Sequence, residues 1–183
     1  FKKSLINQRE IGKHTDTYAS ALRAALREDP DVIVVGELRD PETMALAMTA
    51  AETGHLVIAT MNTTSAIKTV DRLVDAFPAK EQTAVRTMLS ESLKVVIGQN
   101  LAQHAAGNRR IAFHEVLVVT GPVRNLIRDN KTTLIGSAMT VGSDHGMQTV
   151  DMALRKLLDS GDLTAAEAYR HAIKKEDFEE GIA

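Results

Sequence analysis

Two short apolar runs, each followed by polar residues, stand out along the chain. Val32–Val35 is β-branched with no polar alternation, and Leu56–Met61 is a second apolar run. Runs of this kind are typical of strands covered on both faces, as in a parallel sheet. Between them, Asp40 can cap a helix with Pro41 at its first position, and Gly54 fits the helix end. Strand, helix and strand within about 30 residues predict a right-handed βαβ unit.

The segments before this unit have a less regular pattern. Ser4–Ile11 mixes apolar and polar residues and is expected to form a strand. Asp16–Thr17 offers a helix cap, after which Leu22 and Leu26 recur at helical spacing. Pro30 is expected to end that helix, because proline cannot continue it.

Beyond the βαβ unit, the pattern predicts helices around one hairpin. Ser65 is expected to cap a helix that runs to Asp75. A long amphipathic helix is expected over Lys80–Ile97. Asn100–Gln103 and Arg110–Val119 are expected to be strands. The polar turn at Gly107-Asn108 would join these two strands into a hairpin.

After Gly121 the predicted elements are short helices separated by glycine-containing turns. These helices are expected over Val123–Arg128, Thr149–Leu158 and Thr164–Ala172. The whole pattern therefore predicts the α/β class, with strands and helices alternating in the first part. We expect a sheet-based domain over residues 1–120 and a helical C-terminal subdomain over residues 121–183.

Composition narrows the classes of function. The 183 residues are 44% hydrophobic and 25% charged, which suits one sizeable core. A net charge of −2 gives no general attraction to nucleic acid or to anionic membranes. The absence of cysteine excludes disulfides and thiolate chemistry. No apolar run approaches the roughly 18 residues of a membrane span, so we expect a cytosolic domain without a transmembrane segment.

Two features of the sequence limit what the chain is expected to do by itself. It begins with Phe1 rather than methionine, without the pattern of a signal peptide, so we expect it to be part of a longer protein. It also contains no phosphate loop of the G-x-x-x-x-G-K-[ST] type, whose backbone amides and lysine hold nucleotide phosphates. The chain alone is therefore expected to bind ATP poorly.

Candidate chemistry begins where the first apolar run ends, at Gly36 and Glu37. A parallel strand that ends there places one carboxylate at the carboxyl edge of the sheet, where open α/β sheets bind ligands. In folds that hydrolyse nucleotides, such an acid holds Mg²⁺ through water or orients the attacking water. Gly36 would let the backbone pass close to a ligand. The alternative is that Glu37 only leaves the core and is solvated.

The second apolar run carries polar residues at both ends. Asn62 follows it and would lie near Glu37 if the two strands are parallel neighbours, where an amide can bind a phosphate oxygen or a water. The alternative for Asn62 is to cap the next helix together with the residues that follow it. His55 begins the run, and one straight strand would put it about 20 Å from Asn62. Geometry alone therefore does not place His55 beside the chemistry.

The remaining histidines show no spacing that suits a metal site, and solvated or capping roles are expected for them. These are His14, His104, His114, His145 and His171. The sequence also lacks a Gly-x-Ser-x-Gly nucleophile elbow. The carboxyl edge of the predicted sheet is thus the main candidate for chemistry.

Several stretches resemble a known family in the same order along the chain. Asp29–Asp40 (DPDVIVVGELRD) resembles the Walker B box of the secretion and type IV pilus ATPase superfamily, and Thr49–Thr63 (TAAETGHLVIATMNT) resembles its histidine box. Three further stretches make the resemblance to this superfamily more specific, namely Leu22–Arg27, Thr87–Leu93 and Pro122–Lys131. Pro122–Lys131 resembles the A-I-R-N-L-I-R-E element of PilT-like retraction ATPases, with departures at Pro122, Val123 and Asp129.

The resemblance implies a RecA-like P-loop NTPase core with a C-terminal helical appendage. It is a partial core, because a PAS-like domain, the Walker A loop and an aspartate box would precede Phe1. Family members work as cytoplasmic homo-hexamers that hydrolyse ATP with Mg²⁺. They depolymerise the type IV pilus in twitching motility, at an inner-membrane platform protein of the pilus base.

The resemblance also assigns roles to residues. The Walker B box comprises Gly36, Glu37, Arg39 and Asp40. The matching residues of the histidine box are Thr53, Gly54 and His55. The retraction element comprises Arg124, Asn125, Leu126, Ile127 and Arg128. Glu37 would be catalytic and would hold Mg²⁺ through water. Asn62 stands where the family has a second histidine, and we hypothesise that it contacts the γ-phosphate or positions water without titrating.

Two alternatives remain open from the sequence. The first is a pilus-extension, type II secretion or conjugation ATPase, against which the retraction-like element argues. The absence of a four-cysteine zinc site also disfavours that branch. The second is a non-hydrolytic regulatory subunit of the same fold, against which the presence of Glu37 argues.

Overall fold

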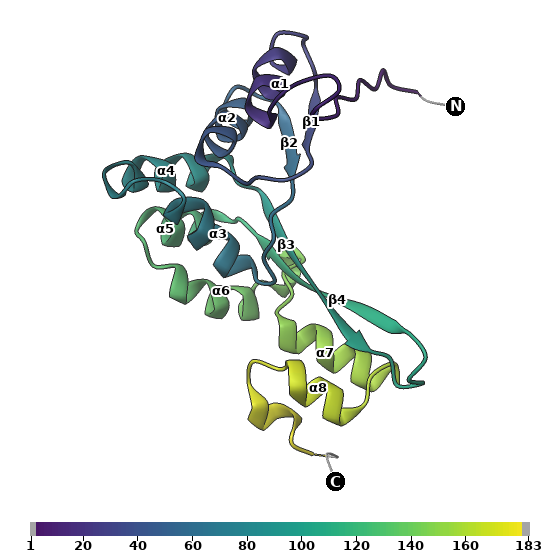
Figure 1. The fold of residues 1–183 in the computed structure, drawn as a ribbon. Coiled ribbons are helices and arrows are strands. Elements are labelled where there is room, and N and C mark those ends of the chain that lie inside the picture. The colour runs from purple at the N-terminus through teal and green to yellow at the C-terminus, as the bar shows by residue number, and fades with distance from the viewer. Residues whose placement is uncertain (1–2, 181–183) are drawn as a thin grey trace. The chain divides into compact units, whose positions relative to one another are not determined.

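A computed structural model describes residues 3–180, which fall into two compact units (Figure 1). The first unit ends at Asn62 and the second begins at Thr63. Phe1, from which we expect the chain to be part of a longer protein, lies outside the described residues. The predicted division into domains at residue 120 stays a prediction.

The first unit is the predicted βαβ arrangement with one helix before it. Its elements are α1 (Tyr18–Ala25), β1 (Val32–Val35), α2 (Pro41–Glu52) and β2 (Leu56–Ala59). Thr17 caps α1 in a reciprocal capping box with Ser20, and Asp40 caps α2 ahead of Pro41. Gly54 follows α2 with φ +102°, a backbone conformation that residues with a side chain rarely adopt. These local signals are why the sequence predicted both helices, although α1 already ends at Ala25 and not at Pro30 as expected.

The two strands pair in parallel, from Val32 opposite Leu56 to Val35 opposite Ala59. Both helices lie on one side of this sheet (Figure 1), where Ile33 and Val35 pack with buried residues of α1 and α2. The other face is exposed, with Val34 71% accessible. The prediction that these strands are covered on both faces is therefore wrong for the described residues. The physical reason is that α1 and α2 pack against the same face.

Ser4–Ile11 does not form the predicted strand. Its residues are exposed, and its regular pairing is limited to an isolated bridge between Ile11 and Thr15. The backbone N–H and C=O groups of a strand need a neighbouring strand to pair with. Among the described residues, no strand pairs with Ser4–Ile11.

The second unit is built around an antiparallel hairpin. Its helices and strands are α3 (Ala66–Asp75), α4 (Ala79–Ser92), β3 (Val95–Gln103), β4 (Arg110–Val118), α5 (Gly121–Arg128), α6 (Ile135–Val141), α7 (Val150–Asp159) and α8 (Ala165–His171). Three 3₁₀ turns complete it, η1 (Thr132–Leu134), η2 (Ser143–His145) and η3 (Lys175–Phe178). Cross-strand pairing runs from Val95 opposite Val118 to Gln103 opposite Arg110, and Gly107 lies in the turn with φ +72°.

The long helix predicted over Lys80–Ile97 is too long at its C-terminal end. The helix ends at Ser92, and Val95, Val96 and Ile97 belong to strand β3. β-branched residues favour strands, and here the pairing with β4 overrides the helical spacing of the apolar positions. The hairpin is therefore longer than the sequence predicted, although its turn is where we expected it.

The core of the second unit is formed by side chains of the hairpin and of the helices that follow it. Phe113, Leu154 and Ala168 belong to one cluster, in which β4, α7 and α8 pack together. Leu117, Val123, Ile127, Ile135 and Met139 are also fully or almost fully buried. Across residues 3–180, no helix is both long enough and apolar enough to cross a membrane.

Glu167 joins helix α8 to the hairpin. Its Oε1 accepts a hydrogen bond from the backbone N–H of Gln103 at 3.0 Å, and His171 Nε2 lies 3.3 Å from the same oxygen. The Gln103 hydrogen bond, helped by His171 and Arg170, lowers the pKa of Glu167 below its ordinary value of 4.5. The carboxylate therefore stabilises the folded state when it is ionised.

Acidification should weaken this attachment. The unfolded chain takes up the proton first, so the stabilisation is complete above pH 4.5 and is lost as the pH falls through the lower, folded-state pKa. Urea unfolding at several pH values should show a smaller acid-induced loss of stability in Glu167→Gln than in wild type. The control is Glu176→Gln, at an exposed side chain of η3, which should retain the wild-type slope. Equal slopes in all three proteins would contradict the assignment.

Candidate functional site

The carboxyl ends of β1 and β2 form one edge, and their pairing continues beyond the strands. Thr60 follows β2 and contacts the loop after β1 twice. Its carbonyl oxygen accepts from the N–H of Leu38 at 2.9 Å, and its hydroxyl donates to the carbonyl oxygen of Gly36. These contacts fix the loop that carries Glu37. Sequence reasoning missed Thr60, although a polar residue inside the apolar run Leu56–Met61 was a usable signal.

Glu37 lies in this loop with its side chain 31% exposed. Its Oε2 accepts from Arg39 Nε at 2.7 Å and lies 2.7 Å from an Arg39 terminal nitrogen. Glu37 raises the pKa of the Arg39 guanidinium above its ordinary value, through this hydrogen bond and through charge. Arg39 is 71% exposed, so the pair is a surface ion pair that adds little to stability. The Glu37 carboxylate is thus held in place while remaining accessible to a ligand.

The other two residues of the Walker B box have different surroundings. A side chain at Gly36 would meet the hydroxyl of Tyr18 at 3.4 Å, which is an ordinary contact distance. Asp40 uses both carboxylate oxygens to cap α2, accepting from the N–H and the hydroxyl of Thr43 at 2.8 Å each. Asp40 therefore has a structural role at the start of the helix, whichever further role the resemblance assigns to it.

Asn62 and His55 lie at opposite ends of β2. Asn62 is exposed and follows the strand on the edge that carries Glu37, whereas His55 precedes Leu56, the first residue of the strand. His55 Nδ1 lies 3.0 Å from the carbonyl oxygen of Ala50 and 3.3 Å from the hydroxyl of Thr53. The residues matched to the histidine box therefore gather at the C-terminal end of α2, away from Glu37 along the strand.

A metal ion at this edge would have few protein ligands. Among residues 3–180, no three carboxylate, histidine or cysteine side chains are close enough together to form a metal site. Mg²⁺ often keeps several waters and binds one or two carboxylates together with substrate phosphates. The lone, accessible carboxylate of Glu37 fits that mode of binding and does not fit an all-protein metal cage.

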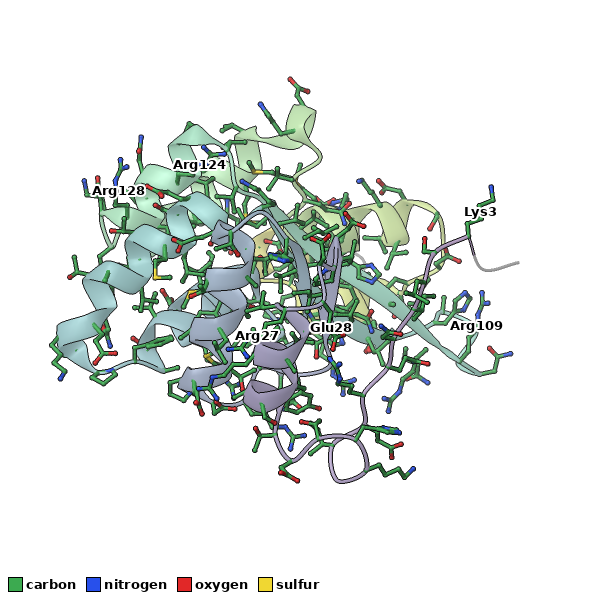
Figure 2. The ribbon with its side chains drawn as sticks, turned by 90° about the horizontal axis from the view of Figure 1, so that it is seen from above. Lys3, Arg27, Glu28, Arg109, Arg124 and Arg128 are labelled. Atoms are coloured by element: carbon green, nitrogen blue, oxygen red, sulfur yellow. The ribbon has the colours of Figure 1, made fainter. Side chains whose placement is uncertain are left out.

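The retraction element forms helix α5, which has one buried face and one exposed face. Ile127 is completely buried and Leu126 is partly buried, so these two residues belong to the packed side. Arg124, Asn125 and Arg128 are exposed (Figure 2 labels both arginines). They line a shallow groove of about 590 Å³ together with the first residues of α5 and the end of α4. The surface available to a partner is therefore polar and basic.

Comparisons with known proteins agree with one another. A family model described as "Type II/IV secretion system protein" matches residues 2–170. The chain is 58% identical to a twitching motility protein of Neisseria gonorrhoeae, over 97% of this chain and 47% of that protein. It is 52% identical to the type IV pilus retraction ATPase PilT of Pseudomonas aeruginosa, over 97% of this chain and 51% of that protein. The chain thus spans about half the length of these curated relatives.

A solved structure matches equally broadly. The crystal structure of a pilus retraction motor PilT with bound ADP superposes with a TM-score of 0.87. Sequence identity is 45%, over 97% of this chain and 50% of that one. This likeness confirms the predicted α/β fold class.

The two faces of α5 should respond differently to substitution. Ile127→Ala leaves a cavity in the core and should lower the free energy of unfolding by about 2–5 kcal/mol. Arg124→Ala changes an exposed side chain and should alter it by no more than about 0.5 kcal/mol. Urea unfolding of both variants provides the measurement. A stable Ile127→Ala protein would show that α5 is not packed as described.

Proposed function

The chain belongs to the family of type II/IV secretion system proteins, and from this premise we propose that it is part of an ATP-hydrolysing motor for type IV pilus retraction. The family has a RecA-like α/β fold. The observation that carries the proposal is the accessible carboxylate of Glu37, held at the carboxyl edge of a parallel strand pair. Ligands bind at this edge in open α/β sheets. Relatives named for twitching and retraction match nearly the whole chain, which favours retraction over extension, secretion or a non-hydrolytic role.

In the proposed reaction, water attacks the γ-phosphate of ATP. Glu37 orients that water, or it holds Mg²⁺ through another water. When bound, Mg²⁺ would offset the negative charge of the phosphates. Arg39 holds the Glu37 carboxylate at 2.7 Å and keeps it oriented. Asn62, on the same edge, would bind the γ-phosphate or the water through its amide, which does not titrate near pH 7.

The remaining parts of the proposal rest on the family resemblance. We propose a homo-hexamer as the working form, at the cytoplasmic face of the inner membrane, on the platform protein of the pilus base. A phosphate loop is not found in these 183 residues, so we propose that the grip on ATP comes from residues outside them. The division into a core over residues 1–120 and a helical subdomain over residues 121–183 belongs to the same proposal. We propose no nucleic-acid partner.

Removing the Glu37 carboxylate should abolish most hydrolysis without unfolding the protein. In the full gene product that carries this chain, Glu37→Gln should lower kcat for ATP by about 100-fold or more, because a charged group in the transition state is lost. Thermal unfolding should be almost unchanged, because the ion pair with Arg39 lies at the surface.

The control for this experiment is Glu176→Gln, at an exposed carboxylate of η3 outside the stretches that carry the family resemblance. Its kcat should match wild type in a phosphate-release assay. If Glu37→Gln hydrolyses ATP as fast as this control, Glu37 is not the catalytic acid of the site.

The exposed face of α5 should couple hydrolysis to retraction. Replacing Arg124 and Arg128 together by alanine should abolish twitching motility while ATP turnover stays within about twofold of wild type, because both arginines come from α5 and neither belongs to the strands or loops assigned to hydrolysis. Twitching zones and phosphate release measure the two effects. Lys80→Ala removes an exposed charge of α4 outside the groove and should leave both unchanged. Equal losses of motility and turnover would contradict a coupling role.

A further inference from the structure

The segment Thr63–Ala66 follows Asn62 directly and leads into helix α3. Side chains of α3 hold its first part. The Thr69 hydroxyl donates to the carbonyl oxygen of Ser65 at 2.8 Å and lies 2.6 Å from the hydroxyl of Thr63. Because the Thr69 proton is used on Ser65, the Thr63 hydroxyl is the donor in the second contact. The segment is therefore tied to the first turn of its own helix.

Strand β3 holds the middle of the same segment. Asn100 Nδ2 donates to the carbonyl oxygen of Thr64 at 3.0 Å. Two residues earlier on the strand, Gly98 brings its backbone so close that an added Cβ would lie 3.1 Å from that carbonyl oxygen. Residues two apart on a strand point to the same face. Gly98 and Asn100 therefore contact Thr64 from the same face of β3, and a side chain at Gly98 would push Thr64 away by a few tenths of an ångström.

Strand β4 holds the end of the segment through Glu115. Glu115 pairs across the hairpin with Gly98, and its side chain is almost fully buried, with the residue 3% exposed. Its Oε2 accepts from the N–H of Ala66, the first residue of α3. The N-cap residue Ser65 makes no capping bond with its own side chain, so Glu115 binds an otherwise unpaired N–H of the first turn. A carboxylate is also favoured there by the helix dipole.

We propose that Gly98, Asn100 and Glu115, the hairpin clamp, are positioning residues for ATP hydrolysis. They fix the segment that begins one peptide bond after Asn62 and thereby restrain the chain at Asn62. The inference rests on the proposed function, because the clamp has a role in hydrolysis only if Asn62 has one. A buried carboxylate is costly to desolvate, and hydrophobic residues of similar volume often stabilise a core as well. Its presence on β4 is therefore explained better by the geometry that it imposes than by packing alone.

The first test measures the restraint without reference to activity. In the full gene product, Glu115→Ala and Asn100→Ala should each speed hydrogen exchange of the amides between Thr63 and Thr69, by about tenfold or more. Glu115→Gln keeps an acceptor oxygen for Ala66 and should exchange more slowly than Glu115→Ala. Leu154→Ala is the control, because it opens a cavity in the cluster of α7 and α8. If this control speeds exchange in the segment as much as Glu115→Ala does, the clamp does not hold it.

The second test asks whether the clamp acts through Asn62. Glu115→Ala should lower kcat by about tenfold with little change in KM for ATP, because a displaced positioning group slows chemistry more than binding. Asn100→Ala should act in the same direction if Glu115→Ala fails to fold. Added to Asn62→Ala, either substitution should lower kcat no further, since residues that act as a unit are not additive. Leu154→Ala should lower the unfolding temperature and leave kcat unchanged.

The outcomes separate the two proposals. Wild-type protein without ATP turnover would overturn the proposed function and with it the catalytic role of the clamp. Normal wild-type turnover with fully additive losses in the double variants would overturn only the clamp, because Glu115 would then act independently of Asn62. Loss of kcat in Glu115→Ala that Glu115→Gln largely restores would support it, since glutamine keeps the acceptor.

Discussion

The parallel pairing of β1 with β2 is the constraint on which the rest of the site depends. Its register, with Val35 opposite Ala59, brings the ends of both strands to one edge, and Thr60 extends the contact past them. A shift of one residue would turn Ile33 and Val35 away from α1 and α2. The burial of one face therefore fixes the edge on which Glu37 lies. The position of the proposed catalytic residue thus depends on the packing of Ile33 and Val35 against α1 and α2.

The hairpin of the second unit imposes a similar constraint on the chain after Asn62. Gly98 and Glu115 lie opposite each other on the hairpin. Gly98 leaves room for the backbone of Thr64, and Glu115 accepts a hydrogen bond from the N–H of Ala66. The strand that carries Glu115 also ends shortly before α5, whose arginines line the exposed groove. One hairpin thus holds the segment that follows Asn62 and leads, through β4, into the helix to which we assign coupling.

Local signals explain which parts of the structure could be predicted. Asp40 before Pro41 and the glycine after α2 mark that helix from sequence alone, and the family resemblance and fold class are confirmed. Features that depend on distant partners could not be predicted. Ser4–Ile11 mixes apolar and polar residues and has no strand paired with it among residues 3–180, and Val96 belongs to a strand because β4 pairs with it. Glu115 binds an amide 49 residues away, which its own surroundings in the sequence do not indicate. The roles of the candidate site residues stay predictions.

The central claim is that the phosphate end of ATP meets this chain at the edge formed by the ends of β1 and β2. A structure of the full gene product with Mg²⁺ and a non-hydrolysable ATP analogue tests it most directly. We expect the γ-phosphate within hydrogen-bonding distance, about 3 Å, of the Asn62 amide, with the Glu37 carboxylate facing it across a water or the metal ion. A γ-phosphate bound instead beside His55, at the opposite end of β2, would contradict the account.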